Sequence, residues 1–103
     1  MSFLVRYSAA ARDDLKRLYD YLLDRSITAE DLELAARALG TIVNSMDSLG
    51  RSPFIYRKPG SNPFLRQLLI PFGNSGYVAL FEIEDATTVT ILGVRHQFED
   101  DYY

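Results

Sequence analysis

The residues best suited to chemistry lie near the end of the chain. Arg95 and His96 are neighbours, and Tyr102 and Tyr103 close the sequence. His96 is the only histidine, and its side chain titrates near neutrality, whereas an arginine carries a fixed planar cation that suits phosphate or carboxylate. A tyrosine hydroxyl can donate a hydrogen bond. Side chains of these types could move a proton beside a bound anion.

A basic stretch in the middle of the chain supplies further cations. Residues 48–81 contain no aspartate or glutamate, whereas four cations fall inside them: Arg51, Arg57, Lys58 and Arg66. The whole chain carries a net charge of −3, which argues against non-specific nucleic-acid binding, because that affinity comes mainly from lysine and arginine. We therefore expect a local positive face on an acidic protein.

The composition fits one folded domain and excludes several kinds of site. The 103 residues are 48% hydrophobic and 24% charged, as in a globular domain with a single core. Because there is no cysteine and one histidine, disulfides and thiolate metal sites are excluded, and we expect no metal and no other cofactor. No apolar run approaches the ~20 residues that span a bilayer, so we expect a cytoplasmic protein without a membrane partner.

Two amphipathic helices are predicted in the first half of the chain. Residues 3–7 are short, apolar and β-prone, and Ser8 follows as an N-cap. Leucines recur at three- and four-residue spacing over residues 9–25, which predicts a helix with one apolar face. Thr28 begins a capping box, and the same period continues over residues 28–49. The short connection between the helices predicts an antiparallel hairpin.

Three strands are predicted after a loop at residues 51–62. Residues 64–70, 77–83 and 88–95 are β-prone runs whose separators are short enough for hairpins. We therefore expect one α+β domain over residues 1–103, with the element order β-α-α-β-β-β. In such a domain the helical hairpin covers one face of an antiparallel sheet.

Strict alternation along the last strand places Arg95 and His96 on opposite faces of the sheet. We therefore expect that they do not act together on one phosphate, unless a bulge or the end of the strand re-aims one of them. By the same count, Arg95 shares a face with Val89, Ile91 and Gly93, and His96 shares the other with Thr90, Leu92 and Val94.

Several segments, taken in order, resemble the RelE/ParE superfamily of type II toxins. They are Val5-x-Tyr-Ser, Asp14-Leu on the first helix, Leu65-Arg66, Gly76-Tyr-Val-Ala-Leu-Phe-Glu-Ile, and Ile91-Leu-Gly-Val-Arg-His. The resemblance covers nearly the whole chain. It implies a small bacterial toxin that arrests growth and forms a hetero-oligomer with a cognate antitoxin, which lays an extended and a helical segment across the toxin surface.

The resemblance implies one of two activities. RelE-like toxins cut mRNA in the ribosomal A site, using basic residues on the sheet and an aromatic or histidine near the C-terminus, to which Arg66, Arg95, His96 and Tyr102 correspond here. ParE-like toxins inhibit DNA gyrase without an evident active site. The net acidic charge, the carboxylates that follow His96 and the long helical hairpin favour the ParE-like activity. The ribosome-dependent endoribonuclease is the alternative, and a non-toxic binding module of the same fold is a third.

For a toxin that acts by binding, the residues expected to contact a partner are Arg57, Lys58, Arg66, Arg95 and His96. Each also has a structural interpretation. Arg57 and Lys58 could be solvated loop charges, the stem of Arg66 could cover apolar surface, and His96 could cap the end of its strand. The acidic run that begins at Glu99 is expected to be a solvated tail. The alternatives are an ion-pair partner for Arg95 and an electrostatic complement to a basic antitoxin segment.

Overall fold

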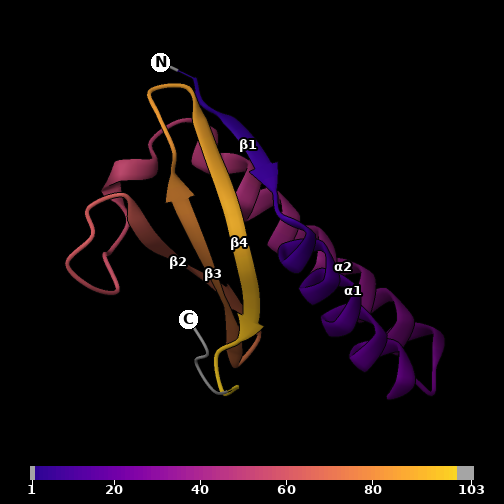
Figure 1. Ribbon diagram of the computed structural model, residues 1–103. Helices are drawn as coiled ribbons and strands as arrows, with labels where there is room; N and C mark the ends of the chain where they lie inside the picture. Colours follow the sequence, from indigo (N-terminus) through magenta and orange to yellow (C-terminus); the bar gives the residue numbers. More distant parts are fainter. Residues whose placement is uncertain (1, 100–103) are drawn as a thin grey trace.

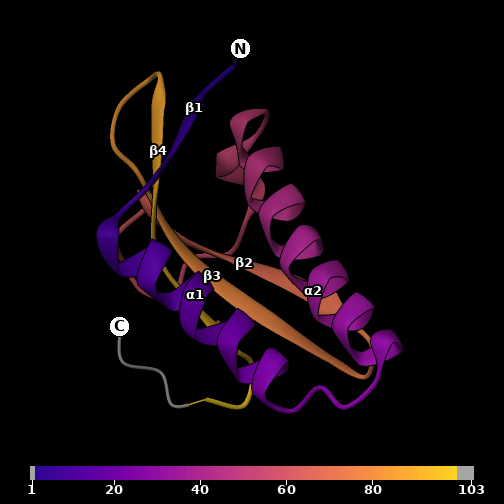
Figure 2. The same ribbon diagram turned by 90° about the vertical axis from the view of Figure 1, so that its right-hand side faces the viewer.

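The computed structural model describes residues 2–99 as a four-stranded sheet with two helices on one face (Figures 1 and 2). The strands and α-helices, in order, are β1 (Leu4–Tyr7), α1 (Ala9–Asp24), α2 (Ala29–Asp47), β2 (Leu65–Phe72), β3 (Ser75–Ile83) and β4 (Thr88–His96). Two short 3-10 helices, η1 (Ser48–Gly50) and η2 (Pro53–Ile55), lie between α2 and β2. The sheet order is β1-β4-β3-β2, with β1 parallel to β4 and the other neighbours antiparallel. The predicted α+β class and the element order are confirmed. No helix among the described residues is long and apolar enough to cross a membrane.

Both helices begin with the caps that the sequence predicts. The Ser8 hydroxyl accepts a hydrogen bond from the Ala11 amide at 3.0 Å, which satisfies a backbone donor that has no partner inside α1. Thr28 and Asp31 form a reciprocal capping box at the start of α2, in which the Thr28 hydroxyl accepts from the Asp31 amide at 3.1 Å. The hairpin therefore starts at two points that local side-chain chemistry defines.

The core lies between the hairpin and the sheet. Phe81 on β3 is fully buried, and so is Met46 on α2. Each large apolar side chain that is removed from water stabilises the fold by about 1.5–3 kcal/mol. The other members of the core include Ala11, Leu18, Ile42, Leu49, Leu68, Ile70, Ala79, Ile83, Val89, Ile91 and Val94.

A bulge in β4 changes which residues share a face. Gly93 pairs with Leu80, but Ile91 pairs with the next residue, Phe81, so that Leu92 is the extra residue. Val94 and His96 therefore lie on the helix-facing side together with Val89 and Ile91. The predicted grouping, which assumed strict alternation, is wrong for this reason. The prediction that Arg95 and His96 face opposite sides is confirmed, since Arg95 pairs with Val78 and His96 with Tyr77.

Ser8, which precedes α1, and Asp14 on α1 form hydrogen bonds with the backbone at the bulge. The Ser8 hydroxyl donates to the Leu92 carbonyl at 3.1 Å, and the Val94 amide donates to Asp14 Oδ2 at 2.9 Å. Without these partners, part-buried backbone groups would lack hydrogen bonds, at a cost of about 1–3 kcal/mol each. The bulge is thus part of the contact between α1 and β4.

A two-residue turn at Gly73 and Asn74 joins β2 to β3, since Phe72 pairs directly with Ser75. Gly73 has φ of +60°, as the first central position of a type II′ hairpin turn requires. The strands therefore extend further toward this turn than the predicted ranges 64–70 and 77–83. Ser75 consequently belongs to β3, which places its hydroxyl next to the end of β4.

Candidate functional site

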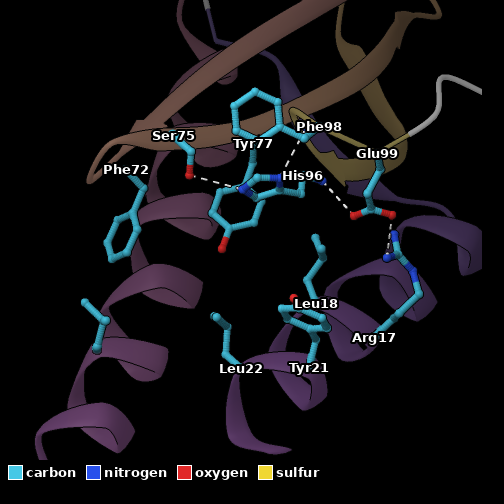
Figure 3. Close-up of a pocket in the computed structure, with 11 residues that line it drawn as sticks. Arg17, Leu18, Tyr21, Leu22, Phe72, Ser75, Tyr77, His96, Phe98 and Glu99 are labelled. Atoms are coloured by element: carbon cyan, nitrogen blue, oxygen red, sulfur yellow. Dashed lines mark hydrogen bonds and ion pairs between the residues drawn. The ribbon is translucent and has the colours of Figure 1, made fainter. Parts of the chain in front are cut away.

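A pocket of about 610 Å³ opens where the helical hairpin diverges from the sheet, beside the end of β4 (Figure 3). Its apolar side chains come from both helices and from the sheet, and four polar residues stand at one edge. The apolar lining is Leu18, Tyr21, Leu22, Leu34, Phe72, Tyr77 and Phe98, and the polar edge is Arg17, Ser75, His96 and Glu99. The pocket offers mainly apolar contact.

Both ring nitrogens of His96 are engaged in hydrogen bonds. The Phe98 amide donates to Nδ1 at 3.2 Å, and Nε2 lies 3.1 Å from the Ser75 hydroxyl oxygen. Because Nδ1 accepts a hydrogen bond, the proton of the neutral ring is on Nε2, which therefore donates to Ser75. In this arrangement the remaining lone pair, on Nδ1, is occupied by the Phe98 amide, so His96 has no free lone pair with which to take a proton from Ser75 or from a substrate.

Glu99 joins the end of β4 to α1. One of its carboxylate oxygens accepts a hydrogen bond from the His96 amide at 2.9 Å, and the other accepts from the Arg17 guanidinium at 2.8 Å. Burial opposes ionisation of Glu99, but the His96 amide and Arg17 outweigh it and lower the pKa of this carboxyl. Burial and the charge of Glu99 together raise the pKa of Tyr77. The expectation of a solvated tail is therefore wrong for Glu99.

Arg95 lies on the other face of the sheet and does not line the pocket. Its guanidinium is near the carbonyl oxygens of His96, Gln97 and Glu99, at 3.4, 3.3 and 3.3 Å. These carbonyls belong to the turn that ends β4. Arg95 thus stabilises this turn from the side opposite to His96.

Arg66 lies toward the other end of the sheet and binds backbone carbonyls. Its guanidinium donates to Pro63 at 2.7 Å, to Phe54 at 2.9 Å and to Tyr56 at 2.8 Å. On β3, Arg66 is opposite Phe81 and His96 is opposite Tyr77. Arg66 and His96 are therefore roughly 13 Å apart along the strand direction. The structure therefore does not bring Arg66, Arg95 and His96 around one point.

Arg57 and Lys58 are exposed in the loop before β2. The Arg57 carbonyl accepts a hydrogen bond from the Gln67 amide at 2.9 Å, so this part of the loop runs along the outer edge of β2. Neither Arg57 nor Lys58 lines the pocket. Tyr102, the remaining candidate, lies outside the described residues.

The sequence interpretation missed most of the pocket. Ser75 lies between two predicted strands, Arg17 lies within the predicted first helix, and Phe98 follows the last predicted strand, and none of the three was a candidate site residue. The sequence contains one signal for this site, which is the opposite charge of Arg17 on α1 and Glu99 after β4. Because the two residues are 82 positions apart, the sequence does not indicate that they are in contact. Among residues 2–99, no cluster of three or more carboxylates or histidines is placed to hold a metal ion.

Known proteins resemble this chain over nearly its whole length. The family model for the ParE toxin of the parDE type II toxin–antitoxin system matches residues 5–101. "Toxin RelE1" of Caulobacter vibrioides is 35% identical over 99 residues, which are 96% of this chain and 98% of that protein. A solved chromosomal ParDE toxin–antitoxin system from P. aeruginosa has a chain with the same fold, with a TM-score of 0.73 at 20% identity over 92% of this chain and 96% of that one. The chain therefore belongs to the ParE family of toxins from type II toxin–antitoxin systems, within the RelE/ParE superfamily, and an antitoxin is its partner.

Proposed function

We propose that this toxin arrests growth by binding DNA gyrase, without an active site of its own. The sequence resemblance to ParE-like toxins suggests the target. The separation of the candidate catalytic side chains is the observation that carries the proposal. RNA cleavage without a metal needs a base, an acid and cations around one phosphate, and here Arg66 and His96 lie toward opposite ends of the sheet while Arg95 is on its other face.

The hydrogen bonds of these side chains also support a binding role. Arg66 directs its guanidinium to three backbone carbonyls, and His96 uses both ring nitrogens within the protein. Bringing Arg66 and His96 to one RNA phosphate would require these contacts to break. A surface that acts by contact needs no such rearrangement.

Purified toxin, assayed in parallel on two targets, tests this proposal. We expect inhibition of supercoiling and accumulation of gyrase-dependent DNA breaks with purified gyrase, and intact mRNA in translating ribosomes. Cuts at the ribosomal A site, without an effect on gyrase, would support the endoribonuclease instead. Normal growth during induced expression of soluble toxin would support the non-toxic binding module.

Variants at the two proton-transfer candidates sharpen the same test. We expect His96→Ala and Tyr102→Phe to retain most of the growth arrest, because neither residue performs chemistry in a binding toxin. The exposed neighbour Gln97, changed to alanine, is the matched control. Complete loss of growth arrest in a His96→Ala protein with an unchanged melting curve would contradict the proposal.

The antitoxin covers the pocket in this proposal. A volume of about 610 Å³ with a mainly apolar lining can receive the apolar side chains of an antitoxin segment, and Arg17 and Glu99 can form hydrogen bonds at its edge. Such a segment would also cover Tyr21 and Leu34, which are 53% and 45% exposed in the isolated toxin. Burial of these side chains would contribute to the affinity of the complex.

Two leucines on α2 test the place of the antitoxin. Leu34 lines the pocket, whereas Leu32 is similarly exposed but does not. We expect Leu34→Asp to weaken antitoxin binding by about 30-fold, the size typical of a central interface residue, and Leu32→Asp to have little effect. Titration calorimetry with the purified antitoxin measures both. Equal losses in the two variants would place the antitoxin elsewhere on α2.

A further inference from the structure

Three large apolar side chains are exposed at the end of the sheet that is distant from the pocket. Phe54, Ile55 and Phe64, which we call the aromatic patch, are 49%, 74% and 50% exposed. The Phe54 ring lies between those of Phe3 and Phe64, at centroid distances of 6.5 and 6.4 Å in edge-to-face geometry. Apolar side chains that are clustered and exposed in this way are typical of protein interaction sites.

The backbone holds these side chains in their exposed positions. Pro53 is buried, and the Tyr56 ring packs on the buried Phe81 ring at 6.0 Å. The segment thus has a buried residue, Pro53, at one end and a partly buried residue, Tyr56, at the other, and it exposes Phe54 and Ile55 between them. The patch is a consequence of ordered packing, and its exposure does not arise from a loose loop.

Arg66 further orders the patch. Its guanidinium binds the carbonyls of Phe54, Tyr56 and Pro63, and its central carbon lies 5.6 Å from the centre of the Phe54 ring. One side chain therefore fixes both segments that carry the patch. A surface ordered before binding loses less conformational entropy when a partner docks.

The charges around the patch are of both signs but are segregated. Arg51, Arg57 and Lys58 are exposed in the loop that carries Phe54, and residues 48–81 contain no carboxylate. On the other side, Glu82 and Glu84 adjoin Phe64 in a small depression. The two glutamates would repel nucleic-acid phosphates, whereas an apolar centre between cations and carboxylates suits a protein surface.

We propose that the aromatic patch is the surface with which this toxin binds its target protein, and that the target offers an apolar hollow with carboxylates on the side that faces Arg57 and Lys58. The identity of that target as gyrase rests on the proposed function.

The patch is separate from the pocket. The Phe64 carbonyl accepts a hydrogen bond from the Ile83 amide at 2.7 Å, and Ile83 is roughly 20 Å along β3 from the pocket residue Tyr77. Toxin bound through the patch leaves the pocket accessible.

Two isoleucines provide a matched test. Ile55 is in the patch and is 74% exposed, whereas Ile27 is in the turn between the helices and is 92% exposed. We expect Ile55→Glu to weaken gyrase inhibition by about 30-fold and to relieve growth arrest, with unchanged melting temperature and antitoxin affinity. Ile27→Glu should behave as the wild type. Reversal of charge at Arg57 and Lys58 should reduce inhibition less and make it less sensitive to salt.

The possible results separate this inference from the choice of gyrase. If the wild type arrests growth without affecting gyrase, the proposed function fails, and the loss of growth arrest in Ile55→Glu alone still supports the patch. Full growth arrest by folded Ile55→Glu overturns the inference. Two other outcomes also overturn it. One is that the toxin binds bare DNA, and that reversal of charge at Arg57 and Lys58 abolishes this binding whereas Ile55→Glu does not. The other is that the toxin forms a dimer that Ile55→Glu dissociates. A wild type that arrests no growth contradicts both proposals.

Discussion

The two ends of the sheet are held together in different ways. At the pocket end, side chains from separate elements bind one another: Arg17 of α1 binds Glu99 after β4, and Ser75 of β3 binds His96 of β4. At the aromatic end, one side chain, Arg66, binds the backbone of two segments. The first arrangement leaves a hollow that can receive a partner. The arrangement at the aromatic end fixes projecting rings that can enter a hollow on a partner protein.

This difference has a consequence for mutation. A contact between two exposed or half-exposed side chains is worth little, because water replaces either partner. A side chain that binds backbone carbonyls of two segments at once holds those segments together, so its loss affects more of the molecule. We therefore expect the aromatic end to be more sensitive to a single substitution than the pocket end.

The largest effect is expected at Arg66. Arg66→Ala removes hydrogen bonds to three carbonyls and the contact with the Phe54 ring, which should lower the free energy of unfolding by about 2–3 kcal/mol. Arg66→Lys keeps the charge but lacks the planar fork, so it should lose most of the same stability. Urea unfolding followed by circular dichroism measures both variants. A lysine variant as stable as the wild type would show that only charge matters here.

The next largest effect is expected at the bulge that precedes the pocket end. Asp14→Ala leaves the Val94 amide without its acceptor at 2.9 Å, and we expect a loss of about 2 kcal/mol. Asp14→Asn retains an acceptor oxygen and is the matched control. Hydrogen exchange of the Val94 amide should accelerate in the alanine variant alone. Similar acceleration in both variants would mean that the charge of Asp14, which also lies 3.6 Å from Arg17, is what stabilises the bulge.

A smaller effect is expected at Ser75. Ser75→Ala removes the acceptor of the His96 Nε2 proton, at a cost of about 1 kcal/mol or less, because the pocket admits water. The nitrogen chemical shifts of His96 should still report the proton on Nε2, since the Phe98 amide continues to bind Nδ1. Ser61→Ala, in the exposed loop, is the control. A change of tautomer in Ser75→Ala would show that Ser75, and not Phe98, orients the imidazole.

The smallest effect is a pH dependence at Glu99. Because its pKa is lower in the folded protein than its ordinary value of 4.5, the stabilisation is complete above that value and is lost as pH falls through the folded pKa. The Arg17 side chain is 45% exposed, so solvent limits the contribution to about 0.5 kcal/mol. Glu99→Gln should melt at a lower temperature than the wild type at pH 7 and approach it near pH 3. Glu84→Gln is the exposed control, and a constant difference for Glu99→Gln across this range would contradict the assignment.

The elements were predictable wherever local chemistry defines them. Ser8 and Thr28 cap helices through backbone groups three residues away, so both starts can be read from short motifs. The face of His96 depended on the bulge at Leu92, for which the neighbouring Gly93 is only a weak local signal. It arises where β4 meets the start of α1, so that its partners Ser8 and Asp14 lie more than 70 positions away.

The resemblance of several segments to known toxins indicated the family. Residue types and their spacing were sufficient for the α+β class, the order of the elements and the helical hairpin. These properties depend on periodicity and on contacts between near neighbours, which a sequence contains directly. Packing alone placed Arg66 among carbonyls, set the proton on Nε2 of His96 and assembled the pocket and the aromatic patch. Such properties depend on side chains that folding brings together from distant positions, and their geometry exists only when the core has formed.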